Sequence, residues 1–541
     1  MKRLLTPLMT LLGLMLPMGY CQDFSANPLG MFVEQHRLYL LGPETIIATA
    51  LLFGLAHIMF EKKPENREQT WSYAVIGCVI ALLCLVMQGA MIYADGPVNY
   101  SVFYNMFQAD FFSLLMRSLL VLGTMAVLLM SRTYIRKRTT VCGEFYVVML
   151  AALLGGMLAT GAMDLIMLFV SLETLSISSY IMVGYLRDDR LSAEAALKYL
   201  VYGGVATASL LFGLSLLYGL TGSTNYTEIV RVIHTVNPSF MILAVMAVTI
   251  LAGFGFKLSA APFHMWTPDV YHGAPTPMTA FLSVVSKMAG FAVVIRFLYL
   301  LMPDLAGWGS VLSALAVLSM VIGNVVALGQ TNIKRLLAYS TIAHVGYMLL
   351  GLVVLTPAGI ASLLYYLIAY FFMNLGTFAL VIHISNRTGS DEIASYAGLV
   401  QRKPTVVLAL TLFLLSLAGI PVTSGFFGKF FLFQAVAQAG HNHLWLVVIA
   451  LLTSTISLYY YLNIIRLMMI KDPSPEVTQL KSEPDSLKSS MVLNPVALTV
   501  AICVLATMWL GFMAEGGIGL TTMAVDQMRV PVQGVLAQLH P

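Results

Sequence analysis

The amino-acid sequence predicts an all-α membrane protein with about fourteen transmembrane helices, including two inverted five-helix repeats that each contain a broken helix. Three observations predict this fold. The chain has 541 residues, of which 59% are hydrophobic and 10% are charged. Its apolar stretches recur at the length that a helix needs to cross the hydrocarbon layer, about 20 residues. Two of these stretches are interrupted by proline or glycine beside a lysine.

The apolar stretches define the predicted spans in order. They lie near 44–60, 72–94, 111–131, 144–163, 165–186, 195–220, 239–262, 277–302, 308–328, 333–355, 358–384, 405–435, 444–470 and 491–514. The longest polar stretch, 471–490, is rich in proline, serine and charge, so no segment is large enough to bury a soluble core. The chemistry of this chain is therefore expected inside the bilayer.

Lysine and arginine are concentrated in every second loop, which is typical of loops that remain in the cytoplasm. Loops after odd-numbered helices carry Lys62, Lys63, Arg67, Arg132, Arg136, Lys137, Arg138, Arg187, Arg190, Lys334, Arg335, Arg387, Arg402, Lys403, Arg466, Lys471, Lys481 and Lys488. The other side has Arg37, Arg231 and Arg529 and little else. This alternation supports the span count and predicts that both mature termini lie outside the cytoplasm. The net charge of +4 then reflects topology, and we expect no nucleic-acid partner.

The predicted spans divide the chain into regions. Residues 1–22 have a basic start and a short apolar core, which is typical of either a secretory signal or an extra N-terminal helix. A three-helix region is expected at 23–143, the first five-helix repeat at 144–302 and the second, inverted repeat at 308–470. The cytoplasmic loop at 471–490 then precedes a C-terminal helix at 491–514 and a tail at 515–541.

Two lysines are predicted near the first helix break. Lys257 lies in FGFKLSAAPFHMWTPDVYHGAPTP, and Lys287 is about ten residues from either end of the next span. A charge in hydrocarbon costs about 2.5–3.5 kcal/mol on insertion scales, so an ionisable residue there indicates function. A break at membrane depth is tolerated only where protein or a watery cavity covers it. The alternative for Lys257 is a kinked structural helix with a snorkelling lysine.

Lys429 lies at a second break, in SLAGIPVTSGFFGKFFLF. This helix comes five helices after the one that holds Lys257, so the two are expected to run in opposite directions. Paired interrupted helices of opposite orientation indicate inverted repeats around an ion site.

Glu173 and His344 are the other deep polar residues in predicted spans. Glu173 is expected to be either a charged partner of a lysine or a neutral core acid. The first role suits a proton switch, because the proton affinity of the carboxylate depends on whether the lysine is charged. His344 falls between the two halves, where a neutral imidazole can pass a proton between lysine sites. The alternative for His344 is a hydrogen-bonded core histidine.

Four further residues have less specific positions. Lys198 is near the cytoplasmic start of its helix, so it either snorkels or takes part in a proton relay. His264 and Asp269, at the cytoplasmic end of the first broken helix, either take up protons or cap that end. Arg296 is closer to the outer end of its span and is expected to reach the interface.

No resident cofactor or metal is predicted. The five cysteines include no CxxC pair, and the sequence lacks a dinucleotide-binding loop, a phosphate-binding loop and an HExxH motif. An iron–sulfur cluster needs clustered cysteine ligands.

Four stretches carry a family resemblance over roughly residues 40–515. They are KLSAAPFHMWTPDVYHGAPTPMTAFLSVVSK, LFVSLETLSISSYIMVGY, KRLLAYSTIAHVGYM and GIPVTSGFFGKFFLF. These stretches resemble the antiporter-like membrane subunit N of proton-translocating NADH–quinone oxidoreductase, respiratory complex I, the counterpart of mitochondrial and chloroplast subunit 2. Subunits L and M and the multisubunit cation/proton antiporters share the broken lysine helix, but their motif reads closer to PxHxWLPDAxxxAPTP. The WTPDVYHGAPTP form is more similar to subunit N.

The resemblance implies a proton-translocating translocase subunit in a bacterial inner membrane. It assigns the channel carboxylate to Glu173, the channel lysines to Lys257, Lys287 and Lys429, and the central histidine to His344. FMN, iron–sulfur clusters and quinone are then expected on other subunits. Expected partners are membrane lipid, subunits of the M, K, J and A types and, through them, the peripheral redox arm. The GGMLATGAMDL stretch also resembles the chloroplast and cyanobacterial counterpart, whose complexes use ferredoxin in place of NADH.

The expected mechanism is a redox-driven proton relay. A proton from the cytoplasm reaches Lys257 or Lys287, moves by way of His344 to Lys429 and leaves outside. A change in charge in a neighbouring subunit shifts the Glu173–Lys257 pair, since opposite charges interact strongly in a medium of low dielectric constant. Two other functions fit the residues: a Na⁺ or K⁺/proton antiporter subunit without a redox partner, and a structural scaffold with inert lysines.

Overall fold

The computed structural model describes residues 37–95, 100–236, 239–301, 308–480 and 495–528. The segment expected at 1–22 lies outside the described residues.

Helices form nearly all of the described chain. The α-helices are α3 (Gly42–Phe60), α4 (Thr70–Asp95), α5 (Phe111–Arg136), α6 (Gly143–Thr160), α7 (Leu165–Val183), α8 (Arg190–Thr221), α9 (Tyr226–Val236), α10 (Phe240–Leu258), α11 (Trp266–Gly273), α12 (Thr276–Ser283), α13 (Val285–Leu301), α14 (Trp308–Ala327), α15 (Ile333–Val354), α16 (Pro357–Thr388), α17 (Pro404–Ala418), α18 (Ser424–Gln438), α19 (Leu444–Ile470), α20 (Pro475–Thr478), α22 (Pro495–Phe512) and α23 (Ala514–Met528). Two short strands, β1 (Ser101–Val102) and β2 (Phe107–Gln108), pair antiparallel between α4 and α5. Short 3-10 turns occur at Leu38–Leu41, Pro64–Gln69, Ile393–Tyr396, Leu399–Gln401 and His441–His443.

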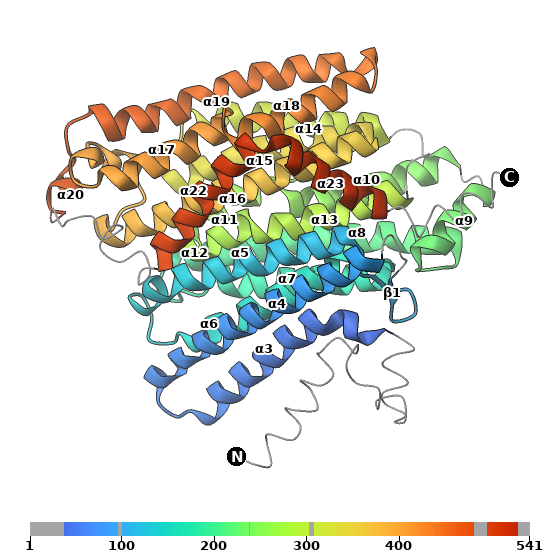
Figure 1. Ribbon diagram of the computed structural model, residues 1–541, viewed down its shortest axis with the longest axis horizontal. Helices are drawn as coiled ribbons and strands as arrows, with labels where there is room; N and C mark the ends of the chain where they lie inside the picture. The colour runs from blue at the N-terminus through green and yellow to red at the C-terminus, as the bar shows by residue number, and fades with distance from the viewer. Residues whose placement is uncertain (1–36, 96–99, 237–238, 302–307, 481–494, 529–541) are drawn as a thin grey trace.

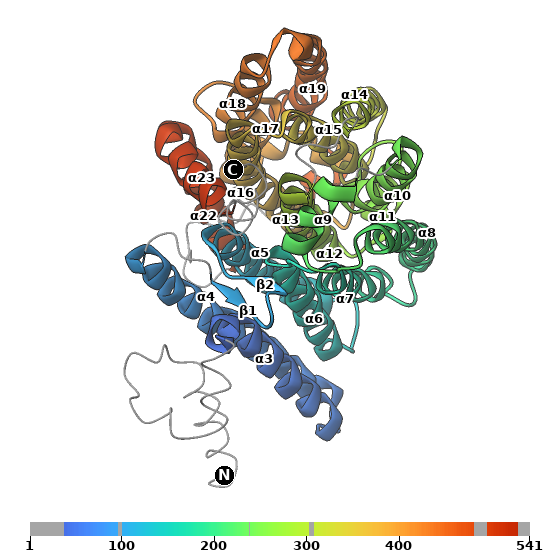
Figure 2. The ribbon, with the colours of Figure 1, turned by 90° about the vertical axis from the view of Figure 1, so that its right-hand side faces the viewer.

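The long helices lie side by side as one bundle, with α3 and α4 at one edge and α19 at the other (Figure 1). Seen along the helices, α13 and α16 are near the middle, and α22 and α23 lie beside α16 (Figure 2). Every residue of α12 and α13 is buried, whereas α8 and α19 expose many apolar side chains. This distribution fits a protein whose outer helices face lipid.

The predicted membrane spans agree with the helices. Among the described residues, thirteen helices are long and apolar enough to cross a membrane, and each matches a predicted span. The remaining span, predicted at 405–435, consists of α17 and α18, two helices of 15 residues separated by a break. The all-α membrane fold is therefore confirmed.

Both predicted helix breaks occur at residues with positive φ. The first follows α10, where Ser259 has φ 64° and Pro262 has no N–H to continue the helix. The second follows α17, where Gly419 has φ 89° and Val422 has φ 78°. At each break the left-handed residue reverses the chain, so that the next N–H caps the last turn: Ala260 N donates to Gly255 O at 2.8 Å and Ile420 N to Leu415 O at 3.0 Å.

Residues 514–528 differ from the expected tail, because they form α23. Backbone hydrogen bonds from Met513 N to Trp509 O at 2.8 Å and from Gly517 N to Met513 O at 3.1 Å carry the helical pattern across the junction with α22. The glycines of this segment have low helix propensity, and packing of α23 against α5 and α16 outweighs it. The last span therefore continues as a kinked helix.

One face of α7 points outward. Its exposed side chains are Ile166, Val170, Ile177 and Ile181, which recur at helical spacing. Glu173 lies within this stretch and is partly exposed. The carboxylate is therefore near the edge of the bundle.

Candidate functional site

Lys257 and Lys287 meet at the first helix break, and both are buried. Lys257, in the last turn of α10, donates through Nζ to Ser176 Oγ of α7 at 3.0 Å. Lys287, in the first turn of α13, donates to the carbonyl oxygen of Lys257 at 3.3 Å and to the hydroxyl of Ser259. The Lys287 ammonium also lies 5.2 Å from the centre of the Trp266 ring, within the range of a cation–π interaction.

The break itself creates the acceptor for Lys287. Because α10 ends at Leu258, the Lys257 carbonyl has no helical N–H partner, whereas the carbonyls of Gly255 and Phe256 accept the N–H groups that cap the helix. The C-terminal end of a helix also carries partial negative charge, which stabilises a nearby cation. The Lys257 backbone therefore supports the Lys287 side chain.

Lys429 has the same kind of environment at the second break. Its buried ammonium donates to the carbonyls of Leu417 at 3.2 Å and Ala418 at 3.0 Å, which are the last two residues of α17. It also donates to Ser454 Oγ of α19 at 2.9 Å and lies 5.1 Å from the centre of the Tyr347 ring. Each break thus presents carbonyls, a hydroxyl and an aromatic face to one ammonium.

Glu173 lies close to this first site without a direct ion pair. Thr207 of α8 donates to its carboxylate at 2.8 Å, and Lys257 contacts Ser176, one turn further along α7. Among the described side chains, no ammonium or guanidinium lies within 4.0 Å of the Glu173 carboxylate. The expected Glu173–Lys257 pair is therefore separated by Ser176.

His344 is buried on α15 between two tyrosine hydroxyls. Its Nδ1 lies 2.6 Å from Tyr366 Oη and its Nε2 3.3 Å from Tyr461 Oη. Tyr461 also contacts the hydroxyl of Ser340, one turn earlier on α15. Both ring nitrogens are therefore in hydrogen-bonded contact, which a proton relay requires.

The tyrosines around His344 were not predicted from the sequence. Thr341 Oγ1 lies 2.9 Å from Tyr370 Oη, which accepts from Asn374 Nδ2 at 2.8 Å. Tyr366, Tyr370 and Asn374 recur every four residues in α16, so they form one polar stripe in an apolar helix. The four-residue spacing of these polar residues could have identified them from the sequence.

Tyr271 is buried on α11, which packs against α8 and α15. Its ring centre is 6.4 Å from that of Trp266, which the Lys287 ammonium also contacts. The buried Tyr271 hydroxyl has no hydrogen-bond partner among the described residues. Buried polar groups are rarely unpaired, so a bound water is expected there.

Lys198 and Asp269 belong to an ion network at the end of the bundle where Arg138, Arg187 and Lys334 also lie, called here the basic end. Asp269 accepts from Lys198 at 2.7 Å and from Arg335 at 2.7 Å. Burial alone would raise the pKa of Asp269, but the hydrogen bonds from Lys198 and Arg335 lower it below its usual range. The network joins α8, α11 and α15, and Arg335 was not predicted as part of it.

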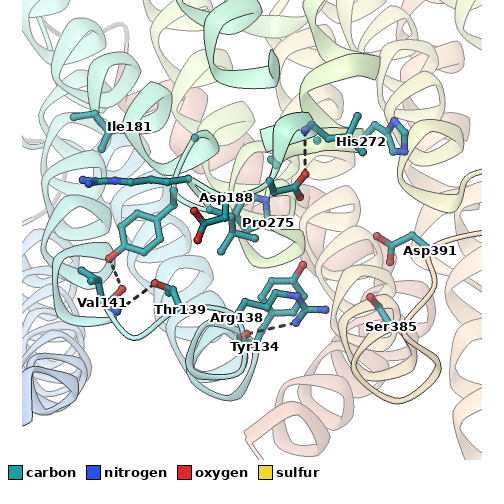
Figure 3. Close-up of a pocket in the computed structure, with 18 of the residues that line it drawn as sticks. Tyr134, Arg138, Thr139, Val141, Ile181, Asp188, His272, Pro275, Ser385 and Asp391 are labelled. Carbon is teal, nitrogen blue, oxygen red and sulfur yellow. Dashed lines mark hydrogen bonds between the residues drawn. The ribbon is translucent and has the colours of Figure 1, made fainter. Parts of the chain in front are cut away.

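A cavity of about 890 Å³ opens at the basic end. Figure 3 shows His272, Asp188 and Asp391 around it, and Gly273–Pro275, between α11 and α12, form part of its wall. Lys334 Nζ donates to the carbonyl of Ala274 in this wall at 3.2 Å. Burial lowers the pKa of His272, and the nearby Lys334 and Arg335 lower it further.

His264 is buried in the turn between α10 and α11. Its Nδ1 has no hydrogen-bond partner in the part of the chain that the structure describes. The sequence alternatives, uptake of protons or capping, therefore both stay open for this residue.

Two buried ion pairs lie away from the lysine sites. Arg296 contacts Asp110 at 2.8 Å, and Arg117 contacts Glu44 at 3.3 Å. The expectation that Arg296 reaches the interface is wrong, because its guanidinium is 1% exposed and also donates to the carbonyl of Thr160. Its partner is 186 positions earlier in the chain, so spacing could not reveal the pair.

No group of three or more His, Cys, Asp or Glu side chains among the described residues is arranged to hold a metal ion.

Comparisons with known proteins agree with this arrangement. A family described as "NADH:quinone oxidoreductase/Mrp antiporter, TM" matches residues 162–457, which include both helix breaks. The chain is 44% identical to NAD(P)H-quinone oxidoreductase subunit 2 of Thermosynechococcus vestitus over 89% of this chain and 92% of that one. It is 46% identical to the same subunit of a Nostoc species over 87% and 90%. A chain of respiratory complex I from Thermus thermophilus, solved with bound aureothin, is similar with a TM-score of 0.71 and 29% identity, over 88% of this chain and 98% of that one.

Proposed function

Because the chain belongs to the family of NADH:quinone oxidoreductase and Mrp antiporter transmembrane subunits, we propose that it carries protons across the membrane through its buried lysines. Its relatives are subunit 2 of NAD(P)H-quinone oxidoreductase, so the chain is a membrane subunit of such an enzyme complex. The observation that carries the proton-transfer role is the placement of Lys287 and Lys429 on carbonyls freed by helix breaks.

This placement allows each lysine to hold and release a proton. A buried ammonium is costly unless it is hydrogen-bonded, and the free carbonyls provide acceptors without a permanent counter-charge. A carboxylate in place of these carbonyls would form a strong ion pair with the ammonium and so oppose the release of its proton. The lysines are therefore sensitive to small changes in the charge around them.

The proposed proton path begins at the basic end, which we assign to the cytoplasm from its lysines and arginines. The cavity beside His272 supplies water up to the segment between α11 and α12. The proton then reaches Lys287 and Lys257, with Lys198 and Asp269 stabilising α11 at this end.

From the first site, the path continues across the middle of the bundle. Tyr271 and a bound water bridge the Lys287 region to Tyr370. His344 then passes the proton toward Lys429 through its tyrosine contacts, and the proton leaves on the other side of the membrane. Hydrogen-bonded networks of this kind transfer protons without large movement of side chains.

Glu173 is the proposed coupling residue. Its position at the edge of the bundle lets it respond to charge in an adjacent subunit, and Ser176 is the contact that α7 makes with Lys257. A gain or loss of negative charge at Glu173 changes how well the nearby site holds a proton.

We infer that 144–302 and 308–470 are inverted repeats. At each break a residue with positive φ, Ser259 or Gly419, is followed closely by a proline, Pro262 or Pro421. At each break a lysine ammonium contacts the freed carbonyls. Related environments of this kind are typical of transporters built from repeats.

The proposed setting is the inner membrane of a bacterium, with both mature termini on the non-cytoplasmic side. The chain would contact antiporter-like subunit M and the small K, J and A type subunits, and FMN, iron–sulfur clusters and quinone would be bound elsewhere in the complex. The relatives are named NAD(P)H-quinone oxidoreductase subunit 2, which makes a nicotinamide nucleotide the first candidate electron donor. Ferredoxin is the second candidate electron donor. Assays of the purified complex with NADH, NADPH and reduced ferredoxin distinguish these donors.

The test of the function is proton translocation by the complex in proteoliposomes. Lys429→Ala should lower the protons moved per quinone reduced while the complex content stays constant. Lys471→Ala removes an exposed lysine after α19 and serves as the control. An unchanged ratio in Lys429→Ala would favour an inert scaffold, and transport driven by a Na⁺ or K⁺ gradient without quinone would favour an antiporter.

A further inference from the structure

The C-terminal helix α22 packs directly against the second helix break. Gly511, near the end of α22, lies so close to the Val422 carbonyl that a Cβ built at position 511 would be 2.2 Å from that oxygen. Real Cβ atoms essentially never approach another heavy atom closer than 3.0 Å. Glycine is therefore required here for the two backbones to touch.

The backbone at Val422 is strained. It has φ 78°, a conformation that a β-branched side chain rarely adopts. Its side chain is 51% exposed in the single chain, so its own packing gives little support. Conformations of this kind persist only when the surrounding structure holds them, and Gly511 is the backbone that lies against the Val422 carbonyl.

Two contacts fix this part of the C-terminal segment on α16. Tyr365 donates through its hydroxyl to the carbonyl of Leu510 at 2.7 Å, beside Gly511. A Cβ at Gly517 would lie 2.6 Å from the same tyrosine ring. The kinked helix is therefore held to the bundle on both sides of its bend.

The strained residue is connected to the Lys429 site through a short segment. Only Gly419, Ile420 and Pro421 separate Ala418, whose carbonyl accepts from Lys429, from Val422. Pro421 has a restricted φ, and the N–H groups of Gly419 and Ile420 both donate to the carbonyl of Leu415 at 3.0 Å, so the segment is tied to the end of α17. A displacement of the break therefore moves the acceptors of the ammonium.

We propose that Gly511 is a positioning residue for Lys429: the contact of α22 with the Val422 backbone holds the carbonyls of Leu417 and Ala418 in place. This inference rests on the proposed proton-transfer role of Lys429. It assigns the C-terminal helix, which lies outside the matched 162–457 region, a role in proton transfer.

The test compares two glycine substitutions in the assembled complex in proteoliposomes. Gly511→Ala inserts a methyl group against Val422, whereas Gly516→Ala, on α23, meets no atom within 4 Å. We expect Gly511→Ala to lower the protons moved per quinone reduced at least twofold at unchanged complex content. Gly516→Ala should keep the wild-type ratio.

A rescue variant separates positioning from a general packing defect. Glycine at 422 has more backbone freedom than valine, so Val422→Gly lets the carbonyl of residue 422 turn away from the new methyl group while Ala418 stays in place. We expect Gly511→Ala/Val422→Gly to recover at least half of the lost ratio. In a Lys429→Ala background, Gly511→Ala should cause no further loss. Failure of the rescue, or a further loss in the Lys429→Ala background, would overturn the inference.

The remaining outcomes are also decisive. If Lys429→Ala itself keeps the wild-type ratio, the proposed function fails; if Lys429→Ala lowers the ratio but Gly511→Ala equals Gly516→Ala, only the positioning role fails. If Gly511→Ala does not assemble, Tyr365→Phe removes the hydrogen bond to Leu510 without adding volume. A wild-type proton ratio in Tyr365→Phe would then overturn the inference, and a lowered ratio would support it.

Discussion

The ammonium of Lys287 lies 3.3 Å from the carbonyl oxygen of Lys257, so the side chain of one lysine is held by the backbone of the other. This contact exists because α10 ends one residue later, at Leu258. The helix break therefore determines both where Lys257 points and what Lys287 contacts.

Replacement of Lys287 tests this contact. Lys287→Ala leaves the Lys257 carbonyl and the Ser259 hydroxyl without the ammonium, and loss of a buried partner costs about 1–3 kcal/mol. We expect proton translocation coupled to quinone reduction to fall by about tenfold or more. Proton uptake by proteoliposomes, normalised to complex content, measures the effect. Wild-type translocation in the variant would exclude Lys287 from the path.

The hydrogen bond to Glu173 gives a milder prediction. Thr207→Val removes the 2.8 Å contact with the carboxylate but keeps the size of the side chain. We expect about a two- to tenfold loss of proton translocation, since a typical intramolecular hydrogen bond contributes about 0.5–1.5 kcal/mol. Thr174→Val is the matched control, because the Thr174 hydroxyl contacts only the backbone of its own helix. Equal effects of the two variants would contradict a role for Thr207.

Tyr271 tests the link between the two halves. Tyr271→Phe removes one buried hydroxyl that has no partner among the described residues, so stability should change little. We expect proton translocation to fall severalfold, because the proposed bridge from Tyr271 toward Tyr370 needs this hydroxyl. Tyr396→Phe removes another buried, unpaired hydroxyl of the described chain, outside the proposed path. A loss in the control as large as that in Tyr271→Phe would argue against a specific role.

The network around Asp269 predicts a pH dependence of stability. Its folded-state pKa lies below its usual range, so the unfolded chain binds a proton that the folded chain does not. The stabilisation is therefore complete above the ordinary pKa of about 3.9 and is lost as the pH falls through the lowered value. Melting curves of the complex at several pH values measure this. In Asp269→Asn, the melting temperature should fall less at acidic pH than in the wild type. In Asp472→Asn, an exposed control, it should fall as much as in the wild type.

The pair of Arg296 and Asp110 should contribute strongly to stability. Arg296→Met leaves a buried carboxylate without its partner, and breaking a buried pair costs about 3–5 kcal/mol. Arg231→Met breaks an exposed pair with Glu228, which contributes about 0–1 kcal/mol. We therefore expect a lower melting temperature or a reduced complex content only for Arg296→Met. Equal stability of the two variants would contradict this ranking.

The sequence predicted the membrane fold and the two helix breaks because both depend on local properties. Hydropathy gives the spans, and glycine or proline beside Lys257 and Lys429 indicates the breaks. The proximity of Lys287 to the Lys257 backbone was not predicted, since it depends on how α13 packs against α10. Tyrosines in apolar helices are also consistent with simple packing, so the partners of His344 became clear only in three dimensions.

The close approach of α22 to the second break could not be predicted from the sequence either. Gly511 stands in an ordinary apolar helix, and nothing near it in sequence indicates Val422 as its neighbour. Helix α23 was missed because its glycines reduce helix propensity, whereas its stability comes from packing on α5 and α16.

The buried cations have a consequence for how the chain enters the membrane during synthesis. In the pairs Glu44–Arg117 and Asp110–Arg296, the carboxylate precedes its cation in the sequence. The Ala418 carbonyl likewise precedes Lys429.

Synthesis from the N-terminus therefore makes these three acceptors before the cations that contact them. When a helix that carries one of these cations enters the membrane, the acceptor for that cation is already inserted. This order limits the time that an unpaired charge faces lipid. The order of the residues along the chain thus favours insertion as well as the final fold.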